Sequence, residues 1–223
     1  TLTALCHGHP RTGWLLGGFL EGRMVALAVL LATFEPGLVY GHMFGVLPEM
    51  QGRGLGLRLM EQSLETARRQ GARRACWTFE PLEARNAHLY LNRLGARAVA
   101  YHQSYYPPAG DAGQGLDLDR FLCQLDLERP PGPSPKPEPL ERALAAWPVA
   151  VASHIAQAPR LLVEVPADLG GLLRNDPGAA QRWRAGTRAI FEECLGARGM
   201  VADALYSGQV EGRRRSFYRL ARP

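Results

Sequence analysis

With 223 residues, 46% of them hydrophobic and 21% charged, the chain is long enough for one globular domain of ordinary size and a smaller second one. The net charge of +5 comes from arginine clusters without interleaved aromatic residues, which favours solvated faces, so no nucleic-acid partner is expected. No apolar run reaches the roughly 20 residues of a membrane span, and the four cysteines lack the paired spacing of a zinc or redox site, so we expect a reduced cytoplasmic protein without membrane or metal.

Three strands are predicted at the start of the chain. Two apolar runs, 13–19 and 24–34, are separated by the turn signal Glu21-Gly22-Arg23, which is typical of an antiparallel pair. A third strand is predicted at 38–47. Its period-two alternation would place Tyr40, His42, Phe44 and Val46 on one face.

The third strand leads into a glycine-rich turn, Gln51 to Gly56, that opens an amphipathic helix. At the start of such a helix the first backbone N–H groups have no partner within the helix, and the helix dipole adds partial positive charge. Glycine at three alternating positions of the turn removes the Cβ atoms that would keep a ligand's oxygen atoms away from these amides. The turn therefore predicts a phosphate-binding site.

Two common phosphate loops do not fit this turn. A P-loop needs Gly-Lys and then Ser or Thr at the helix start, and the only lysine of the chain is Lys136. A dinucleotide-binding loop needs a third glycine three residues after the second, but counting from Gly54 and Gly56 puts Leu59 there. That loop also needs an acidic ribose partner about 20 residues further on, and none is found.

The elements after the turn complete an ordered set. A strand is predicted at 75–81 and a helix at 85–94, which Gly95 ends. With the Gln-x-x-Gly-x-Gly turn behind a strand that ends in Val-x-Pro, this order resembles the GCN5-related N-acetyltransferase (GNAT) superfamily over roughly residues 13–127. The resemblance implies an α/β (α+β) fold with a central mixed, mostly antiparallel sheet flanked by helices.

We expect three parts in the chain: a GNAT-like domain at 1–127, a linker at 128–139 and a smaller α+β unit at 140–223. The family begins with a further strand and helices, so we expect the front of the domain to be truncated, because the chain does not begin with Met. Six prolines in the twelve residues of the linker preclude helix and sheet and favour an extended spacer.

The C-terminal unit is predicted to contain helices and a hairpin. The helices are expected at 140–147 and 177–195, with Asp176 as N-cap of the second; a strand is expected at 160–165 and a hairpin at 201–206 and 216–220. No second phosphate turn occurs there, so we assign it no cofactor. A structural or dimerising appendage is the favoured interpretation, and a degenerate second copy, or a piece that completes the first domain, is the alternative.

The resemblance implies coenzyme A, as acetyl-CoA, for the phosphate turn. The amides of the turn would hold the pyrophosphate, and main-chain groups at the end of the strand would bind pantetheine. The cofactor-binding residues implied in this way are Val46, Leu47, Gln51, Gly52, Arg53, Gly54, Leu55, Gly56, Leu57 and Asn86. The contact of Asn86 is carried over by analogy, because its distance to Gly95 is shorter than the usual spacing.

Acetyl transfer to an amine needs a base for the ammonium proton and an acid for the leaving thiolate. His42 is the favoured base, because some family members place a histidine four residues before the Val of Val-x-Pro, and Glu80 is the second candidate. The usual acidic tyrosine of the family stands four residues before the terminal glycine, where this chain has Leu91. Tyr90 is one residue earlier, turned by about 100° in an α-helix, and is our candidate acid.

The resulting hypothesis is an acetyl-CoA-dependent N-acetyltransferase in which a primary amine of a small-molecule or peptide acceptor attacks directly. The displaced tyrosine and the large C-terminal unit motivate an alternative, a non-catalytic acyl-CoA-binding or interaction protein. The acceptor is not identified by the sequence, and a homodimer is left open.

Overall fold

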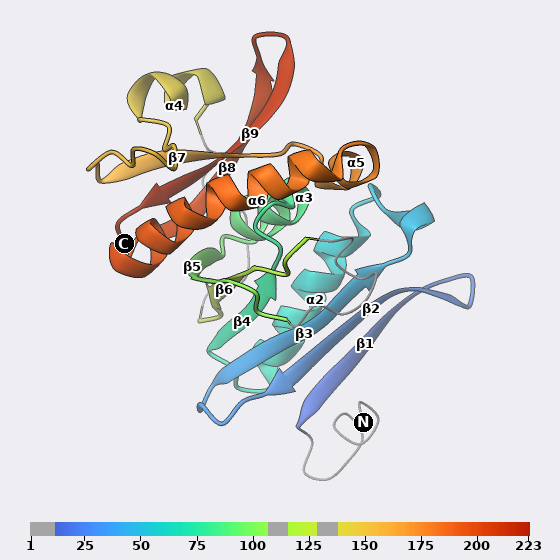
Figure 1. Ribbon diagram of the computed structural model, residues 1–223. Coiled ribbons are helices and arrows are strands. Elements are labelled where there is room, and N and C mark those ends of the chain that lie inside the picture. Colours follow the sequence, from blue (N-terminus) through green and yellow to red (C-terminus); the bar gives the residue numbers. More distant parts are fainter. Residues whose placement is uncertain (1–11, 107–115, 129–137) are drawn as a thin grey trace. The chain divides into compact units, whose positions relative to one another are not determined.

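The computed structural model describes residues 12–106, 116–128 and 138–223. In these residues the chain forms nine strands, mostly antiparallel, together with helices, so the predicted fold class is confirmed (Figure 1). The chain forms two compact units, the first made of Thr1–Trp77 and Gln124–Gly132, the second of Thr78–Cys123 and Pro133–Pro223. None of the helices in the described ranges is long and apolar enough to cross a membrane.

The first unit holds the predicted hairpin, third strand and phosphate turn. Its strands follow one another in the order β1-β2-β3-β4, antiparallel except for the parallel pair β3–β4. Its elements are β1 (Gly13–Leu20), β2 (Arg23–Ala32), β3 (Leu38–Val46), the short 3-10 helix η1 (Pro48–Met50), α2 (Leu55–Arg69) and β4 (Arg74–Phe79), whose last two residues belong to the second unit.

Helix α2 packs against β1, β2 and β3 through one apolar face (Figure 1). Its buried residues recur at the spacing of one helix face, Leu59, Met60, Ser63, Leu64 and Ala67. The hydroxyl of Ser63 donates to the carbonyl of Leu59 at 2.7 Å, which satisfies the polar group of this face. Around Leu59, the strands contribute buried alanines and the half-buried side chains of Phe44 and Val46. This packing fixes the direction in which α2 leaves the glycine-rich turn.

A β-bulge at His42 interrupts the alternation predicted for the third strand. The register between β2 and β3 passes from Val29↔Met43 directly to Leu30↔Gly41, so His42 is the extra residue without a cross-strand partner. A Cβ atom at Gly41 would lie 2.7 Å from the Phe44 ring, which places these two residues on the same face. The prediction that Phe44 and Val46 share the face of His42 is therefore wrong, because a bulge shifts the period by one residue.

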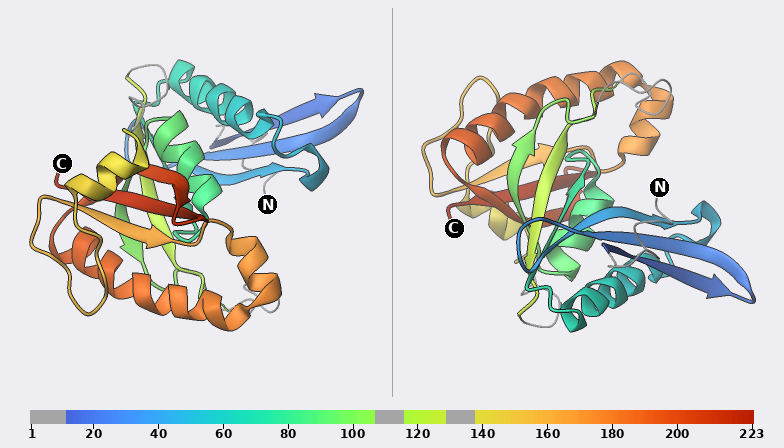
Figure 2. Two further views of the ribbon diagram at one scale, coloured as in Figure 1. Left: turned by 90° about the horizontal axis from the view of Figure 1, so that it is seen from above. Right: turned by 90° about the horizontal axis from the view of Figure 1, so that it is seen from below.

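The second unit has strand order β6-β5-β8-β9-β7. Its helices are α3 (Ala84–Ala87), the π-helix η2 (His88–Arg93), α4 (Leu140–Ala146), α5 (Leu169–Asn175), α6 (Pro177–Phe191) and the π-helix η4 (Glu192–Ala197). Its strands are β5 (Arg97–His102), β6 (Arg120–Asp126), whose last three residues belong to the first unit, β7 (Arg160–Val165), β8 (Val201–Val210) and β9 (Arg213–Ala221). Figure 2 shows the long helix α6 alongside β7, with which it is in contact.

The two units do not coincide with the predicted domains. Strand β5 comes from the predicted first domain, but it pairs with β8 of the C-terminal region through Ala98 and Ala202 within one unit. A proline-rich segment marks where helix and sheet stop, but it carries no information about which strands pair on either side of it. Residues 129–137 of the predicted linker lie outside the described residues.

Both π-helices end in the same way. In η2 the amide of Leu94 donates to the carbonyl of Leu89 at 3.2 Å, and in η4 the amide of Arg198 donates to that of Glu193 at 3.0 Å. Each helix is then followed by a glycine with positive φ, +74° at Gly95 and +61° at Gly199, and by a strand. A residue with a side chain would be strained in this left-handed conformation, so glycine fits both positions.

Candidate active site

The glycine-rich turn brings the first backbone amides of α2 to the surface of the turn, and among the described residues three of them have no backbone acceptor. Gly52 and Gly54 have φ angles of +76° and +77°, and Gly54 is the N-cap of the helix. The first amide of the helix with a backbone acceptor is that of Arg58, which donates to Gly54 at 3.2 Å. Within the described residues, the amides of Leu55, Gly56 and Leu57 donate no backbone hydrogen bond. They are available to an anionic ligand.

There is room for a phosphate group against these amides. A Cβ atom added at Gly52 or Gly54 would meet nothing within 4 Å, so the space beside the turn is open. Arg53 and Arg58 are exposed and form no ion pair among the described residues, which leaves two guanidinium groups beside the turn. Open amides, a helix N-terminus and unpaired cations fit the pyrophosphate of coenzyme A.

The end of β3 combines a free strand edge with an anchored turn. Parallel pairing with β4 runs from Leu38↔Arg74 to Gly41↔Trp77, and β3 then continues to Val46 beyond the last pair. The side-chain amide of Gln51 donates to the Val46 carbonyl at 3.2 Å, and the Leu47 amide donates to Val25 at 3.0 Å. Gln51 therefore holds the turn against the strand, and the Val46 carbonyl keeps a second lone pair for a ligand.

His42 is placed on the surface by the bulge. Its side chain is exposed, and its ring lies 6.4 Å from the ring of Tyr40, centroid to centroid, at a tilt of 44°. Bulges occur often beside active sites because they redirect a side chain without breaking the strand. An exposed imidazole on the strand that leads to the phosphate turn can exchange protons with bound water.

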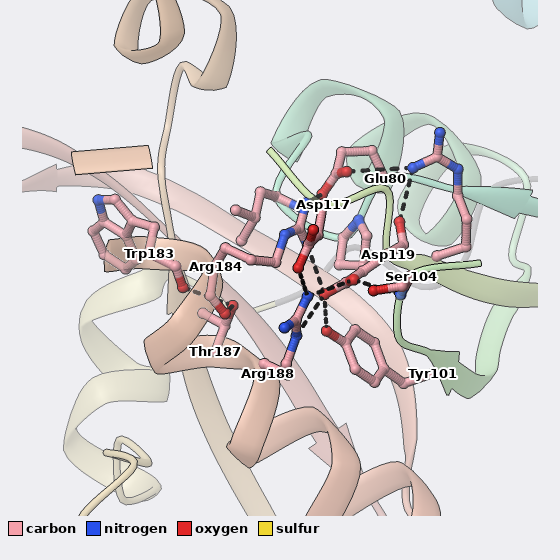
Figure 3. Close-up of polar contacts among 12 residues, drawn as sticks. Glu80, Tyr101, Ser104, Asp117, Asp119, Trp183, Arg184, Thr187 and Arg188 are labelled. Carbon is pink, nitrogen blue, oxygen red and sulfur yellow. Dashed lines mark hydrogen bonds and ion pairs between the residues drawn. The ribbon is translucent and has the colours of Figure 1, made fainter. Parts of the chain in front are cut away.

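Glu80 lies among three donors in the second unit (Figure 3). Its carboxylate accepts from the amide of Leu82 at 2.9 Å, from Arg184 at 2.5 Å and from Arg120 at 3.4 Å. To take a proton from a substrate, Glu80 would have to give up one of these charge-assisted hydrogen bonds. The arrangement therefore favours a structural role for Glu80.

A second carboxylate, that of Asp119, continues this cluster (Figure 3). It is fully buried and accepts from the amide of Ser104 at 2.8 Å, from Arg188 at 2.9 and 3.1 Å, and from the Tyr101 hydroxyl. Arg184, with 4% of its side chain exposed, lies 3.5 Å from it. Sequence reasoning missed this cluster because its partners are up to 104 residues apart and no local motif joins them.

Lowering the pH should destabilise the fold by protonating Asp119. Burial raises the pKa of Asp119, but hydrogen bonds from Arg188, Ser104 and Tyr101 outweigh it and hold the pKa below the ordinary value of 3.8. A lowered folded-state pKa stabilises the fold above the ordinary pKa, and this contribution is lost as the pH falls through the folded pKa. Denaturation at stepwise lower pH below 3.8 should show a steeper loss of stability in wild type than in Asp119→Asn. Exposed Asp126→Asn should keep the wild-type slope, and equal slopes for all three proteins would contradict this assignment.

Tyr90 lies in the π-helix η2, so its side chain points in another direction than the one predicted for an α-helix. A π-helix closes hydrogen bonds from i to i+5, so it accommodates one residue more per turn than an α-helix. The residue five positions before Gly95, Tyr90, thus takes about the direction that an α-helix would give to position 91. The estimated 100° displacement is therefore wrong. Tyr90 is 8% exposed and meets the Phe79 ring edge-on at 5.2 Å, and burial raises the pKa of its hydroxyl.

The predicted site residues are divided between the two units. The glycine-rich turn and His42 belong to the first unit, whereas Glu80, Tyr90 and the half-buried Asn86 belong to the second. Within the second unit, Tyr90 packs on Phe79, the residue before Glu80. Leu91, at the usual position of the family's tyrosine, is completely buried.

Comparison with known proteins agrees with this geometry. Residues 2–96 match the model of the Acetyltransferase (GNAT) family, which confirms the resemblance found in the sequence. No curated protein matches the chain significantly.

Several solved acetyltransferase structures are similar at low identity. An IAA acetyltransferase from Bacillus cereus is 20% identical with a TM-score of 0.47, covering 56% of this chain and 89% of that chain. A Bacillus subtilis acetyltransferase in complex with CoA is 21% identical with a TM-score of 0.45, covering 53% and 79%. The ribosomal-protein-S18-alanine N-acetyltransferase of Escherichia coli is 19% identical with a TM-score of 0.46, covering 56% and 83%. We carry no acceptor over from these proteins.

Proposed function

We propose that the protein transfers an acetyl group from acetyl-CoA to a primary amine of a small-molecule or peptide acceptor. The observation that carries the proposal is the turn at the start of α2, whose first three amides donate no backbone hydrogen bond and lie within the segment that matches the GNAT family model. These amides, with Arg53 and Arg58 beside them, would bind the pyrophosphate. The Val46 carbonyl would bind the pantetheine arm at the free edge of β3.

In this proposal the amine attacks the thioester carbonyl carbon directly. A carbon–nitrogen bond forms, the carbon–sulfur bond breaks, and the thiolate leaves with a proton. His42 takes the proton that the ammonium group must lose before attack, through water, because its ring is exposed beside the end of β3. Tyr90, kept protonated by burial, is the candidate donor for the thiolate.

Replacing Gly54 by alanine should weaken acetyl-CoA binding about tenfold. The added Cβ meets no atom within 4 Å, so its effect comes from the φ of +77°, which costs an L-residue about 1–2 kcal/mol. The free protein can relax this turn, and ligand binding must then restore the strained conformation. Calorimetric titration of the full chain with acetyl-CoA measures the change.

Gly71→Ala is the matched control for this experiment. Gly71 also has a positive φ, +92°, with nothing within 4 Å of an added Cβ, but it follows the far end of α2. The same cost of a left-handed φ, about 1–2 kcal/mol, should lower the free energy of unfolding of Gly71→Ala. Its acetyl-CoA affinity should be unchanged. A wild-type affinity of Gly54→Ala for acetyl-CoA would show that the turn does not bind the cofactor.

A non-catalytic acyl-CoA-binding protein is the second candidate, because Leu91 stands at the family's acid position and is completely buried. A purified protein that binds acetyl-CoA but releases no free CoA with any member of a panel of primary amines would favour it. Release of CoA that depends on an amine would exclude it.

A further inference from the structure

The second unit contains a cavity of about 750 Å³ that has no part in the glycine-rich turn. Its walls come from α3 and η2, from the β8–β9 hairpin and from residues 138–140. This volume lies within the range of about 300–1,000 Å³ that is usual for small-molecule sites. The walls combine apolar side chains, Leu140, Leu205 and Tyr206, with several polar groups.

The first polar group is His88, whose protonation is determined by Asn92. The side-chain amide of Asn92 pairs with the backbone of Leu205, donating to its carbonyl at 2.7 Å and accepting from its amide at 2.9 Å. This pairing fixes which atom of the amide is nitrogen, and its second hydrogen faces Nδ1 of His88 at 3.1 Å. Nδ1 must therefore accept, so the proton of neutral His88 is on Nε2. Partial burial, and then the charge of Arg93, lowers the pKa of His88, which favours the neutral form.

The second polar group is a pair of hydroxyls on the hairpin. Ser207 and Ser216 are 2.8 Å apart, and Ser216 is 1% exposed. Two hydroxyls carry two protons, but the bond between them uses only one. One hydroxyl proton at the cavity wall is therefore left to donate to another acceptor.

The third polar group is the guanidinium of Arg214. The next residue, Arg215, is held by Glu164 in a two-point ion pair at 2.6 Å, whereas Arg214 forms no ion pair among the described residues. Of the two acids at the cavity, Asp168 already accepts from the amide of Gly171 as the N-cap of α5, and Glu138 is exposed. Apart from the exposed carboxylate of Glu138, the groups at this cavity that have spare hydrogen-bonding capacity among the described residues are donors.

We propose that this cavity binds a small molecule through a carboxylate or phosphate group. Arg214, the Nε2–H of His88 and the spare serine proton supply donors for the oxygen atoms, and such charge-assisted bonds are the strong ones. The apolar walls around Leu140 and Leu205 accommodate the rest of the ligand. This site is separate in its residues from the proposed acetyl-CoA turn.

Titration of the full chain with inorganic phosphate and, separately, with butyrate tests the proposal at constant ionic strength. The readout is the ring signals of His88 in nitrogen–proton NMR spectra, assigned with His88→Gln. At least one of the two anions should shift these signals in a saturable way, and the free protein should show the Nε2–H form. Saturation by phosphate alone or by butyrate alone identifies the head group that the cavity accepts.

Arg214→Gln should weaken this binding by roughly tenfold or more, since it removes a charge-assisted hydrogen bond, which is stronger than one between neutral groups. Arg213→Gln is the matched control, because Arg213 is an exposed neighbour on the same strand and does not line the cavity. It should leave the affinity within twofold. Absence of saturation with both anions, or equal weakening by the two substitutions, would overturn the proposal. Activity with acetyl-CoA should be unchanged in Arg214→Gln, so this test is independent of the proposed transferase reaction.

Discussion

Replacement of Arg184 by methionine should lower the free energy of unfolding by about 3–5 kcal/mol, the usual cost of breaking a buried ion pair from one side. Arg184 has 4% of its side chain exposed and links two carboxylates, Glu80 at 2.5 Å and the fully buried Asp119 at 3.5 Å. Methionine fills a similar length and suits a helix equally well, so packing and helix propensity change little. The loss comes from leaving negative charge in the interior with fewer counter-charges.

Urea denaturation followed by tryptophan fluorescence would measure this effect. Arg182→Met is the matched control, because Arg182 lies on the same helix with 73% of its side chain exposed and, in the described part of the chain, one ion pair of 3.4 Å, to Asp176. Exposed pairs contribute about 0–1 kcal/mol, so this variant should stay close to wild type. Similar losses in both variants would show that burial of the charge is not what makes Arg184 important.

His42→Ala should reduce the rate of acetyl transfer about 100-fold, the lower end of the usual contribution of a general base. Acetyl-CoA affinity should not change, because among the described residues no hydrogen bond joins the imidazole to the turn that would hold the cofactor. Stability should change little as well, because His42 is exposed and has no cross-strand partner. The rate is measured as free thiol released from acetyl-CoA in the presence of a primary amine.

Met43→Ala is the control for this substitution, since Met43 is the next residue and is 43% exposed. It should retain most of the activity. A wild-type rate in His42→Ala would exclude His42 from the mechanism, and a parallel loss of acetyl-CoA affinity would assign it to binding instead.

Local patterns predicted much of the fold. The first hairpin follows from the turn Glu21-Gly22, in which both residues adopt positive φ. The second was predicted from its two strands, and its turn, Glu211-Gly212, has the same conformation. The helix over 177–195 follows from its pattern and from Asp176, which caps it by accepting from the Ala179 amide at 2.8 Å. The glycine-rich turn could be predicted because its glycines and the following helix are adjacent in sequence.

Features that depend on tertiary packing could not be predicted from the sequence. The bulge at His42 inserts one residue into a ladder, and sequence alternation alone contains no signal for it. The π-helix around Tyr90 has the same i, i+4 apolar pattern as an α-helix over so short a stretch. The ion cluster of Arg184 and Asp119 joins residues that only the fold brings together, so burial and not sequence spacing determines its role.

The matching ends of the two π-helices have a consequence for assembly. Residues that follow η2 and η4 at equal distances, Ala98 and Ala202, pair with each other across β5 and β8, and each of these strands pairs outward, in the order β6-β5-β8-β9. An antiparallel pair of equivalent residues is what a two-fold axis produces. Here one chain supplies both strands of this junction. Because both sides are tethered, this junction forms independently of protein concentration.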